Sequence, residues 1–199
     1  MKYFFDTQNL LTTNSQKAFT GHPLTIHVAG ILFTAKNVAS QLQYQKILGK
    51  IINAAQKSNP PPTKVSIHPK EIPAIKKHKA LTEETVWGGV SLKKVDVEKD
   101  FIQKLLVVNK YGILGFEFHK EKLEKLNVLE GYCLVFYSNH NSKNWKKGKI
   151  TVKLATVGDK FEFQPYDEHG IVALTDCTVE ETSTNHLDDL FYVFKSSQV

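Results

Sequence analysis

The sequence predicts an all-β protein, an antiparallel barrel or sandwich preceded by a segment with one amphipathic helix. From residue 84 onward, short apolar runs follow one another at close spacing, and residues typical of turns separate them. The composition agrees, because a hydrophobic fraction of 41% and twelve phenylalanines suit a folded protein with a core rich in phenylalanine. At 199 residues, the chain has room for one barrel domain and an appended segment.

The appended segment is expected to occupy residues 1–80, ahead of the barrel domain at 81–199. It opens with a predicted strand over residues 24–33 and continues with a predicted helix over 37–57. Apolar residues recur in this second stretch at helical spacing, at Val38, Leu42, Leu48, Ile52 and Ala55. Asn37 stands where it could cap the first turn, and this helix is the strongest one that the sequence predicts.

Three consecutive prolines, at positions 60–62, end this helix because proline lacks the backbone donor and forces extended geometry. Residues 58–80 are therefore expected to form a connector that lies against the barrel. Alternation over residues 64–69 predicts a short edge strand, and Pro69 and Pro73 limit pairing around it.

The barrel domain is expected to be a succession of short antiparallel strands. Apolar runs predict them over residues 90–95, 103–108, 113–119, 125–129, 132–137, 150–154, 160–163, 170–174, 178–181 and 190–194. Asparagine, glycine and proline mark the turns between many of these runs. Strands at this spacing are typical of an antiparallel barrel or sandwich.

The net charge favours acidic partners only weakly. A formal charge of +6 and a pI near 9.1 are modest, and the lysines are scattered. The cluster at residues 143–149 interleaves Trp145 with lysines, as surfaces that bind nucleic acid do. No nucleic-acid-binding module accompanies it, so we interpret this cluster as a solvated hairpin loop and expect no nucleic-acid partner.

Cys133 and Cys177 are the only cysteines of the chain, and each lies within an apolar run. Two buried, reduced thiols of a cytoplasmic protein are expected, while a disulfide between neighbouring strands stays open because sequence gives no Cα separation. No apolar run approaches the roughly 18 residues that a membrane span needs, and the N-terminus lacks a signal-like apolar run. Secretion and a membrane partner are therefore not expected.

The residues that carry chemistry begin in the predicted strand at 113–119. Alternate side chains of a strand point to one face, so Glu117 and His119 are expected to lie side by side. Glu124 follows just beyond a turn, and Gly131 allows a tight bend into the next strand. Carboxylates and an imidazole at this spacing are able to bind a metal or a sugar.

A second group of residues follows about forty positions later. Gly158 and Asp159 form a turn, Pro165 stiffens the next turn, and His169 opens the following strand. Together the two segments resemble the two signature motifs of cupins. The first cupin motif reads His-x-His, three or four residues, Glu, six residues, Gly, and this chain matches its spacing with Glu117 in place of the first histidine.

Further residues resemble the sugar-isomerase branch of the cupins, the proteins of mannose-6-phosphate isomerase type and lyxose isomerase type. Trp87 with two following glycines, the run at 181–190, and Lys122 between His119 and Glu124 carry this likeness. It covers about residues 84–195 and implies a double-stranded β-helix, the jelly-roll barrel, with the predicted strand and helix as an N-terminal extension. Trp87 itself is expected to plug the barrel.

The resemblance implies a divalent metal held by His119, Glu124 and His169, with Glu117 as a fourth oxygen donor. Two imidazoles and a carboxylate suit Zn²⁺, Mn²⁺, Fe²⁺ or Ni²⁺. A carboxylate in place of an imidazole adds negative charge, which shifts preference toward harder metals or leaves a metal-free polar pocket. Asp188 and Asp189 are expected to cap or end a strand rather than act as acids.

The implied activity is isomerisation of an aldose and a ketose by proton transfer between carbons 1 and 2 of a sugar or sugar phosphate. Glu117 would be the general base, and Lys122 would stabilise the enediolate. The alternative is a non-catalytic cupin that binds a sugar or another small ligand; a dioxygenase fits less well, because such sites usually keep both histidines of the first motif. Many cupins pair through their sheets, so the resemblance also implies a homodimer.

Overall fold

The structure is a computed structural model, and it describes residues 3–6, 9–19, 49, 63–65, 82–140, 143, 146–194 and 197–198. Within these residues, one short helix accompanies a series of strands. The elements are β1 (Phe4–Asp6), α1 (Thr13–Phe19), β2 (Thr63–Val65), β3 (Thr82–Thr85), β4 (Gly88–Asp96), β5 (Phe101–Val108), β6 (Gly112–Phe118), β7 (Glu124–Glu130), β8 (Cys133–Ser138), β9 (Lys149–Ala155), β10 (Lys160–Phe163), β11 (Glu168–Ala173), β12 (Cys177–Ser183), β13 (Leu190–Phe194) and β14 (Ser197–Gln198).

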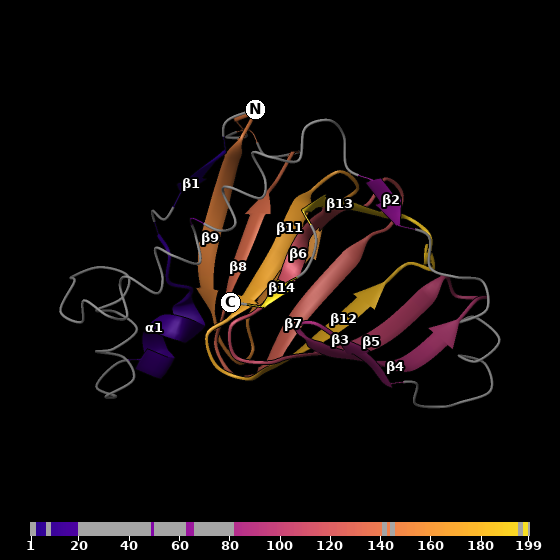
Figure 1. The fold of residues 1–199 in the computed structure, drawn as a ribbon, viewed down its shortest axis with the longest axis horizontal. Coiled ribbons are helices and arrows are strands. Elements are labelled where there is room, and N and C mark those ends of the chain that lie inside the picture. Colours follow the sequence, from indigo (N-terminus) through magenta and orange to yellow (C-terminus); the bar gives the residue numbers. More distant parts are fainter. Residues whose placement is uncertain are drawn as a thin grey trace.

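Eight consecutive strands, β5 to β12, form the jelly roll that gives the fold its class. They divide between two sheets that face one another (Figure 1), in the orders β9-β8-β11-β6 and β10-β7-β12-β5. All of these pairings are antiparallel. This order is that of a double-sheet jelly roll, the fold of cupins among other proteins, and it confirms the predicted all-β jelly-roll barrel.

Outer strands extend both sheets of the barrel. The first sheet has the order β1-β9-β8-β11-β6-β13-β2, with β14 pairing beside β6, and the second has the order β10-β7-β12-β5-β4-β3. All ten strands predicted for the barrel domain are present, and their ends differ from the prediction by at most two residues. β3 was not predicted, since the run at 82–85 is polar and lacks an apolar alternation.

Segments near the N-terminus pair with the first sheet. β1 lies parallel to β9 at one edge, and β2 lies antiparallel to β13 at the other. The position of β2 agrees with the edge strand predicted over residues 64–69, although β2 starts slightly earlier. Neither β1 nor α1 was predicted, and no helix among the described residues has the length and apolar character to cross a bilayer.

Three of the predictions fall wholly or mostly on residues that the structure does not describe. These are the strand predicted over residues 24–33, the helix predicted over 37–57 except for Gly49, and the connector predicted over 58–80 except for β2. All three therefore stay predictions.

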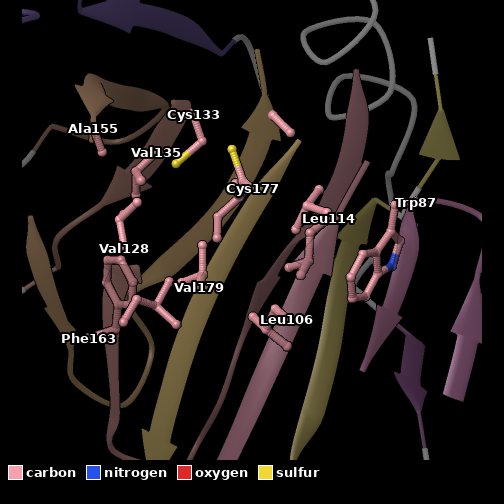
Figure 2. Packing of buried hydrophobic residues seen from close by; sticks show 14 residues of the cluster. Trp87, Leu106, Leu114, Val128, Cys133, Val135, Ala155, Phe163, Cys177 and Val179 are labelled. Atoms are coloured by element: carbon pink, nitrogen blue, oxygen red, sulfur yellow. The ribbon is translucent and has the colours of Figure 1, made fainter. Parts of the chain in front are cut away.

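A hydrophobic cluster fills the space between the two sheets (Figure 2). Leu114 of β6 in the first sheet and Leu106 and Val179 of β5 and β12 in the second contribute to it. Burying a large apolar side chain of this kind contributes roughly 1.5–3 kcal/mol, so this cluster is a main source of the barrel's stability. Trp87, in the turn between β3 and β4, is buried in the same cluster, which agrees with its predicted role as a plug.

A second hydrophobic cluster covers the outer face of the first sheet. Its buried members alternate along the strands with those of the interior cluster, for example Phe136 with Val135 on β8. Leu10 is buried among them, and Tyr3, Phe5 and Leu11 pack against it. The N-terminal residues therefore form a cover over the outside of this sheet.

A β-bulge in β6 turns the chain toward the site. β6 and β11 pair in register at Glu117 and His169 and again at Leu114 and Ile171, so β6 contains one more residue between these pairs than β11. Leu114 packs in the interior and Glu117 lines an interior cavity, although strict alternation would place residues three apart on opposite faces. The bulge therefore brings Glu117 inside the barrel.

Gly170 should be intolerant of any side chain, since β11 passes very close to the bulge there. A Cβ at this position would lie 2.1 Å from the carbonyl oxygen of Gly115 and 2.5 Å from the ring of Phe136. Gly170→Ala should therefore lower the free energy of unfolding by about 1–3 kcal/mol, measured by denaturant titration. Val157→Ala, at a turn position that is 56% exposed, is the control and should stay within about 0.5 kcal/mol of wild type. Equal stability of all three proteins would contradict the close packing.

Candidate metal centre and its charged network

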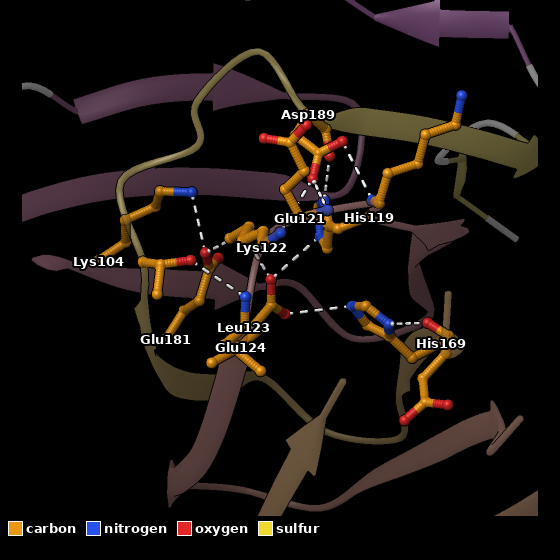
Figure 3. A network of polar contacts seen from close by, with 12 residues as sticks. Lys104, His119, Glu121, Lys122, Leu123, Glu124, His169, Glu181 and Asp189 are labelled. Carbon is orange, nitrogen blue, oxygen red and sulfur yellow. Dashed lines mark hydrogen bonds and ion pairs between the residues drawn. The ribbon is translucent and has the colours of Figure 1, made fainter. Parts of the chain in front are cut away.

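The predicted site residues meet at one end of the barrel (Figure 3). Glu117 lies near the end of β6, His119 follows that strand directly, Glu124 opens β7, and His169 is the second residue of β11. Because β6 and β11 are paired, His169 is directly opposite Glu117. Residues separated by fifty positions in sequence are thus neighbours inside the barrel.

His119 presents its Nε2 atom to the site. Its Nδ1 is hydrogen-bonded to the backbone carbonyl oxygen of Asp189, and since a carbonyl only accepts, Nδ1 carries the hydrogen. Nε2 is buried and has no hydrogen-bond partner among the described residues. It lies 3.3 Å from Oε2 of Glu124, but the contact is not aligned as a hydrogen bond. The contact at Nδ1 therefore directs Nε2 into the barrel, where a neutral ring would offer its lone pair.

His169 is held in the same manner. Its Nδ1 lies 3.0 Å from the backbone carbonyl oxygen of Asp167, and its Nε2 lies 3.2 Å from Oε1 of Glu124. The ring stacks on Phe163, with centroids 4.1 Å apart and planes at 5°. Burial alone would lower the pKa of His169, but the carboxylate of Glu124 outweighs it and raises this pKa. Because both nitrogens face acceptors, this arrangement favours the imidazolium form of the ring.

Glu117, His119 and His169 form a group able to hold a metal ion. One ligand atom from each of the three lies within 4.8 Å of the other two. Protein histidines that bind metals usually donate their second N–H to a carbonyl or carboxylate, which fixes the ring and its tautomer. Both histidines here have their Nδ1 at a backbone carbonyl, and the buried Nε2 of His119 has no hydrogen-bond partner among the described residues. The donor set therefore fits a divalent cation, with loss of one proton from His169 on binding.

Glu124 contacts both histidines of this group and also forms an ion pair with Lys122. Its Oε2 accepts a hydrogen bond of 2.5 Å from Nζ of Lys122, while its Oε1 faces His169. Burial alone would raise the pKa of Glu124, but Lys122 and His169 hold it well below its usual range. Glu124 is thus an anion within reach of both histidine Nε2 atoms, at 3.2 and 3.3 Å.

Lys122 belongs to a chain of buried charges. Its Nζ also donates to Oε1 of Glu181 at 2.7 Å, and the same oxygen accepts from Nζ of Lys104 at 3.0 Å. Burial alone would lower the pKa of Lys122, but the carboxylates of Glu124 and Glu181 raise it above its usual range. Lys122 therefore stays an ammonium ion and cannot act as a base near neutral pH.

Glu117 differs from the other two carboxylates. It is partly buried, and burial raises its pKa, an effect that the nearby His119 and His169 only partly offset. A carboxylate with a raised pKa is a better proton acceptor than an ordinary one. Glu117 is thus the member of the site best suited to move a proton.

Asp189 fixes the loop that carries His119 and Lys122. Its carboxylate accepts hydrogen bonds from the backbone N–H groups of Lys120, Glu121 and Lys122, at 3.1, 2.6 and 2.9 Å. Burial alone would raise the pKa of Asp189, but these three donors lower it. Its own carbonyl oxygen accepts from His119. This agrees with the structural role expected for Asp189 and makes it the residue that positions the loop.

A small cavity of about 60 Å³ adjoins these groups. Its polar lining combines both signs of charge, and its apolar lining comes from β5, from the segment before β13 and from the first residue of β13. The lining residues are Ile102, Lys104, Glu117, His119, Lys122, Glu181, His186, Leu187 and Leu190. A ligand here would contact Glu117, His119 and Lys122 together.

The structure brings together every residue that the sequence proposed for the site, Glu117, His119, Lys122, Glu124 and His169. Sequence reasoning did not assign Lys104 and Glu181 to it, because they come from β5 and β12, which carry neither motif. One signal was available. Glu181 shares the inward face of β12 with the buried Val179 and Ser183, each two residues away, and a carboxylate at an inward position of a strand needs a buried partner.

No protein-family model matches this sequence, and no curated protein matches it either.

Solved structures with a similar barrel include an oxalate decarboxylase from Lactobacillus farciminis, at 16% identity and a TM-score of 0.47 over 57% of this chain and 33% of that chain. CapF matches at 15% identity and a TM-score of 0.47, over 60% of this chain and 34% of that chain. KdgF from Halomonas sp. matches at 19% identity and a TM-score of 0.40, over 55% of this chain and 89% of that chain. The match thus spans about a third of the oxalate decarboxylase, and likenesses of this size carry no inference about ligand or reaction.

Removing either histidine of the group should remove the metal. After incubation with Mn²⁺, Zn²⁺, Fe²⁺ or Ni²⁺, plasma mass spectrometry of the wild type should find near-stoichiometric metal, which His119→Ala and His169→Ala should lack. Loss of a direct ligand should weaken affinity by more than the roughly 10–100-fold typical of residues that only orient ligands. His140→Ala, outside the group and exposed, should bind metal as the wild type does. Equal metal in all four proteins would contradict this site.

Removing the Lys122 ammonium should destabilise the fold. Lys122→Met leaves the buried carboxylates of Glu124 and Glu181 with less compensation, which should cost about 3–5 kcal/mol in the free energy of unfolding. The matched control is Lys125→Met, since Lys125 pairs with Glu162 at an exposed position and should contribute about 1 kcal/mol or less. Adding Glu124→Gln to Lys122→Met should recover part of the loss. An equal effect of the two lysine variants would show that the buried network does not stabilise the barrel.

Proposed function

We propose that this protein binds a divalent metal and isomerises an aldose and a ketose, taking a free or phosphorylated sugar as substrate. The observation that carries the proposal is that Glu117, His119 and Lys122 line one cavity. A proton acceptor, one nitrogen of the metal-binding group and a permanent cation are thus close to the same ligand atoms. Isomerisation between carbons 1 and 2 needs these three functions together.

The cavity suits the reacting end of a sugar rather than a whole one. Its volume of about 60 Å³ is well below the roughly 300–1,000 Å³ of pockets that enclose a complete small molecule. Carbons 1 and 2 with their oxygens would enter it, and the rest of the sugar would remain outside. Leu187 and Leu190 give the cavity an apolar side, against which the C–H groups of the sugar would pack.

The residues divide the chemistry among them. When bound, a divalent metal would polarise the carbonyl and the adjacent hydroxyl of the substrate. His119 and His169 would hold it together with Glu124, whose oxygens lie 3.3 and 3.2 Å from the two Nε2 atoms. Glu117, whose carboxylate also belongs to the metal-binding group, would instead take the proton from carbon 2 and return it to carbon 1. The Lys122 ammonium would donate to the oxygen that becomes negative as the proton leaves. Its raised pKa keeps that donor charged throughout the reaction.

The second candidate is a metal-free protein that binds a small polar ligand without converting it. Lys122 favours this reading, because its ammonium already lies between Glu124 and Glu181 and supplies positive charge to the site. The same polar cavity would then serve for recognition alone. The two candidates differ in whether metal stays bound and whether hydrogen at carbon 2 exchanges.

The Glu117→Gln variant should show whether Glu117 is the general base of an isomerase. With metal supplied, wild type is screened against free and phosphorylated aldoses and ketoses in D₂O, and nuclear magnetic resonance follows both deuterium entry at carbon 2 and product. If Glu117 is the base, Glu117→Gln should keep its metal and lose roughly 10²–10⁴-fold in kcat. Glu162→Gln, an exposed carboxylate paired with Lys125, is the control and should react as the wild type does.

Three results would change the proposal. Full turnover by Glu117→Gln would remove Glu117 from proton transfer. Loss of metal from this variant, with metal retained by Glu124→Gln, would make Glu117 a ligand instead of the base. Ligand binding by the wild type without exchange at carbon 2, with metal present, would favour the binding protein.

A further inference from the structure

The two cysteines of the chain lie opposite one another at the far end of the barrel from the metal-binding group. Cys133 opens β8 in the first sheet, and Cys177 opens β12 in the second. Both are free thiols in the structure, with exposures of 0% and 2%. Figure 2 shows the two cysteines as neighbours at one end of the interior cluster.

Backbone contacts show how close the two residues are. Sγ of Cys177 lies 3.0 Å from the carbonyl oxygen of Tyr132, the residue directly before Cys133. Standard backbone dimensions then place this sulfur within roughly 6 Å of the Cα of Cys133. A Cβ on Gly131, two residues before Cys133, would lie 2.8 Å from the same sulfur. A sulfur this near the backbone at Cys133 is compatible with the close approach of two cysteines that a disulfide needs.

We infer that Cys133 and Cys177 form a disulfide between the two sheets when the chain meets a small disulfide oxidant such as glutathione disulfide. One protein thiolate attacks a sulfur of glutathione disulfide and releases one glutathione thiolate. The second protein thiolate then attacks the mixed disulfide and releases the other. The two cysteines lose two electrons, glutathione disulfide gains them, and the two thiol protons end on the two glutathiones.

Burial decides when this exchange takes place. Neither sulfur is accessible in the folded barrel, so the oxidant reaches the thiols while this end of the barrel folds or opens. Once formed, the bond closes the chain between residues 133 and 177 and restricts the unfolded state. It thus fastens the first sheet to the second.

The bond should leave the metal-binding group untouched. Along the paired strands β8 and β11, Cys133 faces Ala173 at one end, whereas Tyr137 faces His169 at the other. On β12, Cys177 is the first residue, and Glu181 of the charged network lies near the other end. Oxidation is therefore expected to change stability and not metal content.

The test refolds the full chain from guanidinium in defined mixtures of reduced and oxidised glutathione. After alkylation of remaining thiols, intact mass and peptide mapping should show loss of two hydrogen atoms and a peptide that links Cys133 to Cys177. The melting temperature of the linked protein should exceed that of the reduced protein by roughly 5–10 °C. Cys133→Ala and Cys177→Ala serve as controls, and neither should show the oxidant-dependent rise.

Each other outcome would overturn the inference. Two alkylated thiols after refolding with excess oxidised glutathione would show that the sulfurs do not meet. Glutathione adducts on each cysteine without the linked peptide would show the same. A linked protein that melts no higher than the reduced one would show that the bond does not fit the native barrel. These readouts depend on neither turnover nor metal, so their outcome is independent of whether the proposed function is correct.

Discussion

The site depends on one buried anion, the carboxylate of Glu124. An isolated carboxylate inside a barrel would cost several kcal/mol, so its position is sustainable only with partners around it. Lys122 contacts one oxygen at 2.5 Å, and His169 contacts the other at 3.2 Å. The buried ammonium of Lys122 contacts two carboxylates, because it also donates to Glu181. Glu181 thus helps to compensate the charge of Lys122. The charges inside this barrel are therefore a connected set in which each member requires the next.

Hydrogen bonds that involve the backbone fix the positions of the charged residues in this site. Both histidines have their Nδ1 at a carbonyl oxygen, of Asp189 and of Asp167, and those contacts determine which nitrogen is directed inward. The Asp189 carboxylate holds three consecutive N–H groups of the loop after β6. The arrangement of donors is thus built before any ligand arrives, and a ligand would lose little of its binding energy in ordering the protein.

Much of the barrel could be predicted from sequence, because short strands with alternating apolar residues and turn residues between them carry a local signal. The resemblance to the two cupin motifs also implied His119, Glu124 and His169, and the structure brings them together with Glu117 and Lys122. The inward direction of Glu117 rests on a bulge opposite Gly170, a detail of pairing between two distant strands that a single run does not encode. Lys104 and Glu181 were not assigned to the site for the same reason, since their role exists only once β5, β12 and the loop after β6 are adjacent. β1 was not predicted because three residues are too few to show a period.

The cover that the N-terminal residues form over the first sheet restricts how two copies of this chain can meet. Leu10 is 1% exposed against the outer face of that sheet, and β1 occupies the edge beside β9. A second copy that stacked on this face would first have to displace the chain's own first residues and expose their apolar contacts. Among the described residues, the outer face of the second sheet is the less covered one, and it carries the exposed Val107 and Leu129. Removal of the N-terminal residues that form this cover would expose the apolar outer face of the first sheet and make it available for self-association.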